Sequence, residues 1–276
     1  MKNLLKRTVP ITISIIFVFS VLVACAKKET RDLTSEINAL ASFVAESVAG
    51  DDEVTLSKIE DVDRIPELYM RKFDGLETFE AITEGSTVAL IVSQSIDNRS
   101  VKKYDRYYTH AKSDSAFVKT EHFAYFHNGK VAYRDADGEF TVSAIDDYLK
   151  IYGVYPATHG IEGYIVNEKT VISVVRSDEK PNEFVVTLDG ETAGLRNKIQ
   201  MRKYGGLSDY PTFKSVTLTL ELNEDLTPVS VKVFAEYTVP YGILGDVACT
   251  QNYTVTYKNV NGNVDIPDEN VFDMIN

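Results

Sequence analysis

Residues 216–222 read VTLTLEL, and residues 229–239 read VSVKVFAEYTV. In both stretches every second side chain is apolar, and most of the side chains between them are polar. Residues 253–257, YTVTY, repeat the same alternation. Alternation of this length is typical of antiparallel strands that bury one face of a sheet. The last third of the chain is therefore predicted to form strands, with the loop 223–228 closing a hairpin.

Shorter apolar or alternating runs continue this pattern toward the N-terminus. They predict strands at 87–96, 101–110, 116–126, 130–134, 162–166, 170–176, 183–188 and 198–202. An Asn128-Gly129 pair between two of these runs is a strong signal for a tight hairpin. Between the runs, residues 144–152 change to helical spacing.

The N-terminal part of the mature chain is predicted to be helical. Apolar residues recur there at intervals of three and four: Leu33, Ile37, Leu40, Val44 and Val48. This spacing predicts an amphipathic helix over 32–48, and Pro66 suits the first turn of a second helix over 66–73. No internal repeat or low-complexity linker divides residues 32–276. We expect one mainly β (α+β) domain, in which a large curved antiparallel sheet, a half-barrel, has one or two N-terminal helices covering its concave face.

The first residues have the layout of an export signal. Three basic residues precede a short apolar run over 11–23, and no acidic residue occurs before Glu29. A membrane span needs about 20 apolar residues, which is longer than this run. The layout predicts a secretory signal peptide over 1–24. An uncleaved anchor helix is the alternative.

The run ends in Leu22-Val23-Ala24-Cys25, which resembles the lipobox of bacterial lipoproteins. The resemblance implies cleavage between Ala24 and Cys25 and a lipid on Cys25. The expected partner is therefore a membrane, to which this lipid attaches the protein. Residues 25–31 would form a short tether. The protein would then lie on the extracytoplasmic face of a bacterial membrane.

Charge and cysteine content narrow the function further. The formal net charge is −12, and loss of the basic signal would make it three units more negative. An acidic chain is a poor partner for phosphate backbones, so we expect no nucleic acid. If Cys25 carries lipid, Cys249 has no partner in the chain. A buried thiol without reactivity is the expected interpretation, and a reactive thiol is the alternative.

The sequence contains none of the nucleophile or phosphate-binding motifs that we sought, such as Gly-x-Ser-x-Gly, so we expect neither an enzyme nor a cofactor. His122 and His127 are five residues apart on a predicted strand, which places them on opposite faces. That placement does not suit joint metal ligation, and we expect no metal site.

Aromatic side chains are concentrated in the predicted strands between 101 and 126. Together with the first helix they give candidates for the lining of a ligand cavity: Leu40, Val44, Tyr104, Tyr108, Phe117 and Phe123. The alternative is an ordinary core with cross-strand aromatic pairs.

The order of these features resembles a known group of envelope proteins. A lipobox, an N-terminal helix, many strands and the ending Val264-Asp265-Ile266-Pro267 are similar to half-barrel lipoproteins of the LolA/LolB and LppX type. The resemblance implies a hydrophobic cavity between sheet and helix, and a non-catalytic protein that binds or carries an apolar, lipid-like ligand. A cell-surface protein-interaction module with a filled core, its protein partner unknown, and an envelope hydrolase are the alternatives.

Overall fold

The computed structural model describes residues 32–41, 55–90, 92–116, 119–153, 159–205, 207, 209–240 and 245–276. The predicted signal peptide and tether, Cys25, Val44 and Phe117 lie outside these residues. Among the described residues, no helix combines the length and the apolar character that a membrane crossing requires.

The described strands form one open, antiparallel sheet of eleven strands, which confirms the predicted fold class. The strands are β1 (Thr78–Ala89), β2 (Val92–Lys103), β3 (Arg106–Asp114), β4 (Lys119–His127), β5 (Lys130–Asp135), β6 (Thr141–Ala144), β7 (Val171–Arg176), β8 (Glu183–Leu188), β9 (Thr212–Leu222), β10 (Pro228–Pro240) and β11 (Asp246–Lys258). Their order across the sheet is β6-β5-β4-β3-β2-β1-β11-β10-β9-β8-β7.

This order consists of two meanders, β1–β6 and β7–β11, in which each strand pairs with its neighbour in sequence. A single pairing, β1 with β11, joins them, and Ala81 there lies opposite Tyr257. The two strands approach closely at Gly85, where a Cβ atom would lie only 2.4 Å from the Cα atom of Tyr253. Glycine is therefore needed at this point of the seam.

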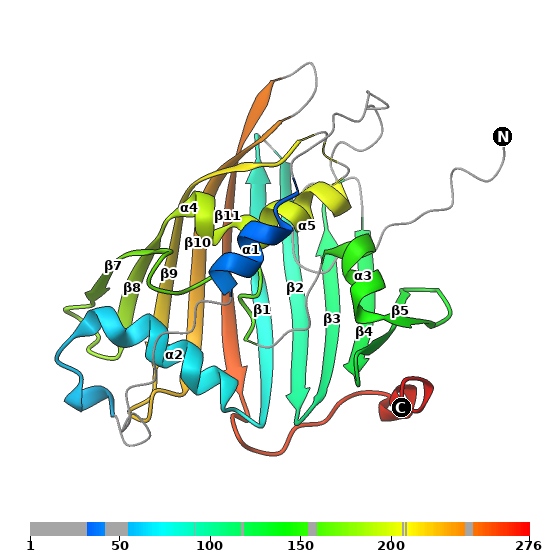
Figure 1. Ribbon diagram of the computed structural model, residues 1–276, viewed down its shortest axis with the longest axis horizontal. Coiled ribbons are helices and arrows are strands. Elements are labelled where there is room, and N and C mark those ends of the chain that lie inside the picture. The colour runs from blue at the N-terminus through cyan, green and yellow to red at the C-terminus, as the bar shows by residue number, and fades with distance from the viewer. Residues whose placement is uncertain are drawn as a thin grey trace.

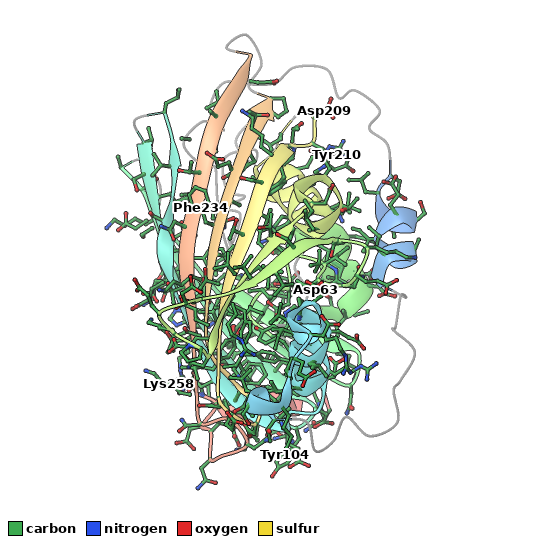
Figure 2. The ribbon with its side chains drawn as sticks, turned by 90° about the vertical axis from the view of Figure 1, so that its left-hand side faces the viewer. Asp63, Tyr104, Asp209, Tyr210, Phe234 and Lys258 are labelled. Atoms are coloured by element: carbon green, nitrogen blue, oxygen red, sulfur yellow. The ribbon has the colours of Figure 1, made fainter. Side chains whose placement is uncertain are left out.

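The helices lie on one side of the sheet (Figure 1). They are α1 (Thr34–Ala41), α2 (Ile65–Asp74), α3 (Ile145–Tyr152), α4 (Gly190–Ala193) and α5 (Leu195–Gly205). The short 3-10 turns are η2 (Leu56–Lys58), η3 (Val62–Arg64) and, on the other side of the sheet, η5 (Glu269–Met274). We call the face of the sheet toward α2, α3 and α5 the inner face, and the opposite face the outer face. In Figure 2, Asp63 lies on the helical side, and Phe234 and Lys258 lie on the other.

The main core fills the space between α2 and the second meander. Leu68, Tyr69 and Phe73 of α2 are buried together with the inner-facing side chains of β8 to β11. The alternation that predicted these strands is confirmed, because Leu218 and Leu220 are fully buried. The predicted helix over 66–73 is confirmed as α2, with Pro66 in its first turn.

Helix α1 confirms the start of the predicted N-terminal helix, and the rest of that prediction lies outside the described residues. Ile37 of α1 and Leu33, which directly precedes the helix, are buried, but they cluster with Ile165 and with Leu195 of α5. α1 thus lies on the inner side of the sheet as a second layer over α5. Among the described N-terminal helices, α2 is the one that packs in the main core.

Two predicted strands were wrong because each spans a hairpin. The run 87–96 contains the end of β1, a turn at Leu90 and the start of β2, and Leu90 has a φ of 55°. The run 101–110 contains the turn between β2 and β3, where Tyr104 has a φ of 59°. Positive φ is uncommon outside glycine, asparagine and aspartate. The Asn128-Gly129 hairpin was predicted correctly, and both of its residues have positive φ.

Two further strand predictions were wrong for a different reason. Residues 198–202 lie in helix α5, since a five-residue alternation is too short to distinguish a strand from a helix. Residues 162–166 form turns and irregular structure, although most of their side chains are buried. The predicted helix over 144–152 is confirmed as α3.

The C-terminal segment covers part of the outer face. Val264, Ile266 and Phe272 cluster there with Tyr108 and Tyr125 of β3 and β4. The Phe272 ring meets the Tyr125 ring edge to face, with 5.6 Å between centroids. The Val264-to-Pro267 ending is thus followed by packed structure.

Candidate functional site

A groove of about 670 Å³ lies between α2 and the segment that leads into the edge strand β7. This volume is within the range of small-molecule sites. The groove is lined by Asp63, Arg64, Pro66, Glu67, Met70, Arg71, Asp74, His159, Tyr164, Ile165, Val166, Asn167, Glu168, Val171, Ile172, Ser173 and Arg196. We call it the α2–β7 groove.

Its lining combines apolar side chains with charges of both signs. Met70 on α2 and Ile165 and Val171 on the opposite wall are apolar. On α2, Arg71 Nη2 and Glu67 Oε1 form an ion pair at 2.5 Å. An amphipathic molecule fits such a lining better than a uniformly charged or uniformly apolar one.

His159 gives the groove a buried, uncharged imidazole. Its ring packs edge to face against Phe73, with centroids 6.2 Å apart, and burial lowers its pKa, so that the neutral form prevails near pH 7. The backbone on either side is held firmly: the His159 N–H donates to Glu162 Oε1 at 2.6 Å, and the Tyr257 hydroxyl donates to the His159 carbonyl at 2.5 Å. Within the described residues, Nδ1 of His159 is buried and has no hydrogen-bond partner.

Tyr164 links the groove to the inner face of the sheet. Its ring lines the groove, and its hydroxyl donates to Oε1 of Gln251 on β11 at 3.0 Å. Burial raises the pKa of Tyr164, so this hydroxyl stays protonated as a donor. Gln251 is itself 1 % exposed and lies opposite Thr87 of β1.

Around Thr87 the inner face changes from apolar to polar. The register places a group of uncharged polar side chains on the inner face of β1 to β4 and β11: Thr83, Thr87, Gln94, Asn98, Ser100, Thr109, Ser113, Thr120, His122 and Gln251. We call this group the inner polar band. All of its members except Thr120 are buried, and it separates the main core from a smaller apolar cluster around Phe126 and Tyr148.

His122, at one end of the band, is held on two sides. Its Nδ1 lies 3.2 Å from Asp135 Oδ1, and its Nε2 lies 2.9 Å from the Tyr148 hydroxyl. Burial lowers the pKa of His122 and outweighs the opposing effect of Asp135. His127 lies on the outer face near Phe272, so the prediction that the two histidines take opposite faces is confirmed.

The residues predicted to line a cavity are not gathered at the groove. Leu40 lies in a separate hollow of about 480 Å³ between α1 and the α4–α5 region. Tyr104 is at the tip of a hairpin and is 61 % exposed. Val44 and Phe117 lie outside the described residues.

Tyr108 and Phe123 lie on the outer face, away from the helices. Phe123 is stacked on His110 at 4.2 Å between ring centroids, and the Arg134 guanidinium lies 4.1 Å from the Phe123 ring centroid. Successive side chains of a strand point to opposite faces, and on β3 and β4 the neighbouring residues Thr109 and His122 face inward. Tyr108 and Phe123 therefore face outward. The aromatic concentration in the sequence is thus divided between the two faces of the sheet.

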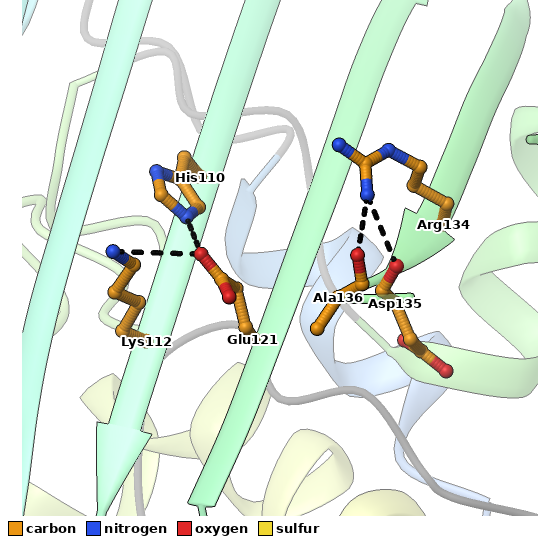
Figure 3. A network of polar contacts seen from close by, with 6 residues as sticks. All are labelled: His110, Lys112, Glu121, Arg134, Asp135 and Ala136. Carbon is orange, nitrogen blue, oxygen red and sulfur yellow. Dashed lines mark hydrogen bonds and ion pairs between the residues drawn. The ribbon is translucent and has the colours of Figure 1, made fainter. Parts of the chain in front are cut away.

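His110 and Arg134, which both contact the Phe123 ring, also make the polar contacts drawn in Figure 3. His110 Nε2 lies 2.7 Å from Glu121 Oε1, and Lys112 Nζ lies 3.4 Å from the same oxygen. Arg134 donates to the Ala136 carbonyl at 2.7 Å. These contacts pair the charged groups at a partly exposed surface, where ion pairs contribute little to stability.

Cys249 faces the inner side and is 4 % exposed, and burial raises the pKa of its thiol to about 11. Within the described residues it is a free cysteine. In the described part of the chain, no group of three or more His, Cys, Asp or Glu side chains is arranged to hold a metal ion.

No protein-family model matches this chain, and no curated protein matches it. Among solved structures, it is similar to a DUF1329 family protein from Desulfovibrio piger, with 10 % identity, a TM-score of 0.32, and coverage of 76 % of this chain and 96 % of the other. It is also similar to the S-type phycobiliprotein lyase CPES from Guillardia theta, with 6 % identity, a TM-score of 0.26, and coverage of 72 % and 98 %. Scores of this size carry no functional argument, so function has to be inferred from the residues of this chain.

Proposed function

We propose that this protein is a lipid-anchored, non-catalytic binder of a small amphipathic or lipid-like ligand, and that the ligand lies in the α2–β7 groove. The observation that carries the proposal is the groove itself, whose volume of about 670 Å³ is of ligand size. Its apolar walls at Met70, Ile165 and Val171 would receive the apolar part of the ligand. The charged residues at α2 would stay in contact with water.

A hydrophobic fluorophore tests this proposal. N-phenyl-1-naphthylamine, which is uncharged, should bind the purified protein saturably and gain fluorescence. Met70→Trp places a large ring in the groove and should weaken binding about tenfold or more, because the volume is lost and the apolar contacts with it. Met274→Trp is the matched control, since Met274 is 48 % exposed on η5 outside the groove.

The absence of saturable binding would reject the ligand-binding proposal. In that case a protein-interaction module becomes the leading function. The feature that supports it is the edge strand β7, where Ile172 and Val175 are 65 % and 59 % exposed. Exposed apolar side chains on an edge strand are typical of strand pairing with another chain.

The membrane anchor is the second part of the proposal, and it rests on the lipobox-like Leu22-to-Cys25 sequence. Cys25→Ala should leave an unprocessed precursor or release the protein from membranes, because the thioether carries the lipid. Fractionation followed by intact mass spectrometry measures both outcomes. Normal processing with unchanged membrane retention would contradict the anchor.

A further inference from the structure

The inner polar band is an unusual interior for a sheet. Asn98, at its centre on β2, is 2 % exposed and lies opposite Thr83 on one side and Ala111 on the other. Elsewhere on the inner face most positions carry apolar residues, such as Leu218, Val233 and Tyr253. Apolar residues at these positions would pack without a hydrogen-bonding requirement, so the polar choice calls for a physical reason.

Only some of the polar groups in the band form hydrogen bonds with one another. Gln94 Nε2 donates to Ser113 Oγ at 2.6 Å, and the Ser100 and Thr109 hydroxyls are 3.4 Å apart. Both amide atoms of Asn98, however, are buried without a hydrogen-bond partner among the described residues. The Oγ1 atom of Thr120 is also buried without a hydrogen-bond partner among these residues. Because buried polar groups in proteins are nearly always hydrogen-bonded, these atoms point to a bound group.

The chemistry of the band indicates what that group is. Amide and hydroxyl groups can both donate and accept hydrogen bonds, and the band contains no carboxylate, ammonium or guanidinium. Its only titratable member, His122, is kept neutral by burial. Asp135 contacts His122 at one end of the band, and Lys102 follows Ser100 on the inner face of β2. At Asn98, between them, a charged ligand group would lose its hydration without gaining a counter-ion from the band, which is strongly unfavourable.

The band also adjoins the α2–β7 groove. Tyr164 lines the groove and donates to Gln251 of the band, and Gln251 lies opposite Thr87 of β1, which in turn lies opposite Gln94 of β2. Asn98 is the second inner-facing residue along β2 after Gln94. We infer that the band binds the uncharged, hydroxyl- or amide-bearing head of an amphiphile whose apolar part lies in the groove. This inference rests on the proposed function and adds the class of ligand.

A neutral and an anionic lipid with the same chain separate the possibilities. Monooleoylglycerol and oleate should each displace N-phenyl-1-naphthylamine from the purified protein, at a pH where oleate is ionised. Monooleoylglycerol should do so at about a tenfold lower concentration, because its hydroxyls can pair with the amide of Asn98. Equal displacement, or a preference for oleate, would overturn the inference. A preference for oleate would assign the head group to Lys102, the next inner-facing residue on β2 after Ser100.

Asn98→Leu gives a test with two readouts. It should abolish the preference for monooleoylglycerol and, at the same time, raise the melting temperature of the ligand-free protein, because it replaces unpaired amide atoms with an apolar chain of similar size. Asn252→Leu is the matched control, since Asn252 is exposed on the outer face of β11, and it should change neither readout. If Asn98→Leu does not fold, Asn98→Val makes the same two predictions, because valine is also apolar and suits a strand position.

The outcomes distinguish the inference from the proposed function. If the fluorophore binds but Asn98→Leu keeps the wild-type preference, the band is a hydrated interior, and the inference is wrong while the proposed function stands. If the fluorophore does not bind, the proposed function fails. A rise in melting temperature with monooleoylglycerol, present in the wild type and absent in Asn98→Leu, would then still support the band as a binding site, and its absence would reject both.

Discussion

His122 and His159 show how single side chains on the inner side are held in one protonation state. Burial is the main cause that lowers the pKa of each imidazole from 6.5. A nearby carboxylate opposes the change in both cases, Asp135 for His122 and Glu162 for His159. Both rings are therefore neutral in the folded protein at a pH where they would begin to protonate in the unfolded chain.

This difference makes stability depend on pH. Below about pH 6.5 the unfolded chain binds more protons than the folded protein, so the free energy of unfolding should fall as the pH drops through this value. Each histidine contributes at most about 1.4 kcal/mol per pH unit. Urea titrations between about pH 5.5 and 7.5 measure the slope, and His122→Gln should remove part of it. A free energy of unfolding that is constant over this range, or a slope unchanged by the substitution, would contradict the assignment.

The sequence predicted the placement of a single side chain only where a regular helix or strand determined which way the side chain points. The strand period correctly separated His122 from His127, and the expectation that Cys249 is buried is confirmed. The sequence alone could not identify His159, Tyr164 or Asn98 as site residues. Their roles depend on contacts with segments far away in the chain, as between Tyr164 and Gln251, and an isolated Asn on a strand has no local pattern.

At the scale of the element, β9 offers a direct test of which face is buried. Leu220 is fully buried in the main core, whereas Thr219 lies on the outer face opposite Lys232 of β10. Leu220→Asp should lower the free energy of unfolding by about 4 kcal/mol or more, since it removes core packing and buries a charge. Thr219→Asp should change it by about 1 kcal/mol or less, because the new carboxylate stays in water beside Lys232. Chemical denaturation measures both, and equal effects would mean that the register is wrong.

Elements were predictable where their pattern was long or their turns had a clear signal. The alternations of β9, β10 and β11 and the Asn128-Gly129 hairpin met this condition. The hairpins at Leu90 and Tyr104 did not, because apolar and aromatic residues occupy the turns and the pattern runs on through them. The short alternation inside α5 was ambiguous for the same reason: local spacing over five residues does not determine the period.

At the scale of the whole molecule, the predicted sheet with helices on one side is confirmed, but the site depends on a different part of it than expected. The first helix packs mainly over α5, and the groove forms between α2 and the entry to β7. These two walls are about a hundred residues apart in sequence. Their meeting follows from the strand order, which no local pattern specifies.

The seam between β1 and β11 has a consequence for the growing chain. Each meander can assemble from neighbours as they are synthesised, since each strand pairs with the next one in sequence, although α4 and α5 lie between β8 and β9 in the second meander. β1 can gain β2 early, but its other side has to wait for β11, which is the last strand to be made. Until residues 246–258 have emerged, the first meander carries an open edge that the finished sheet does not have. β1, the first strand to be synthesised, therefore gains its second pairing partner only when β11, the last strand, has been made.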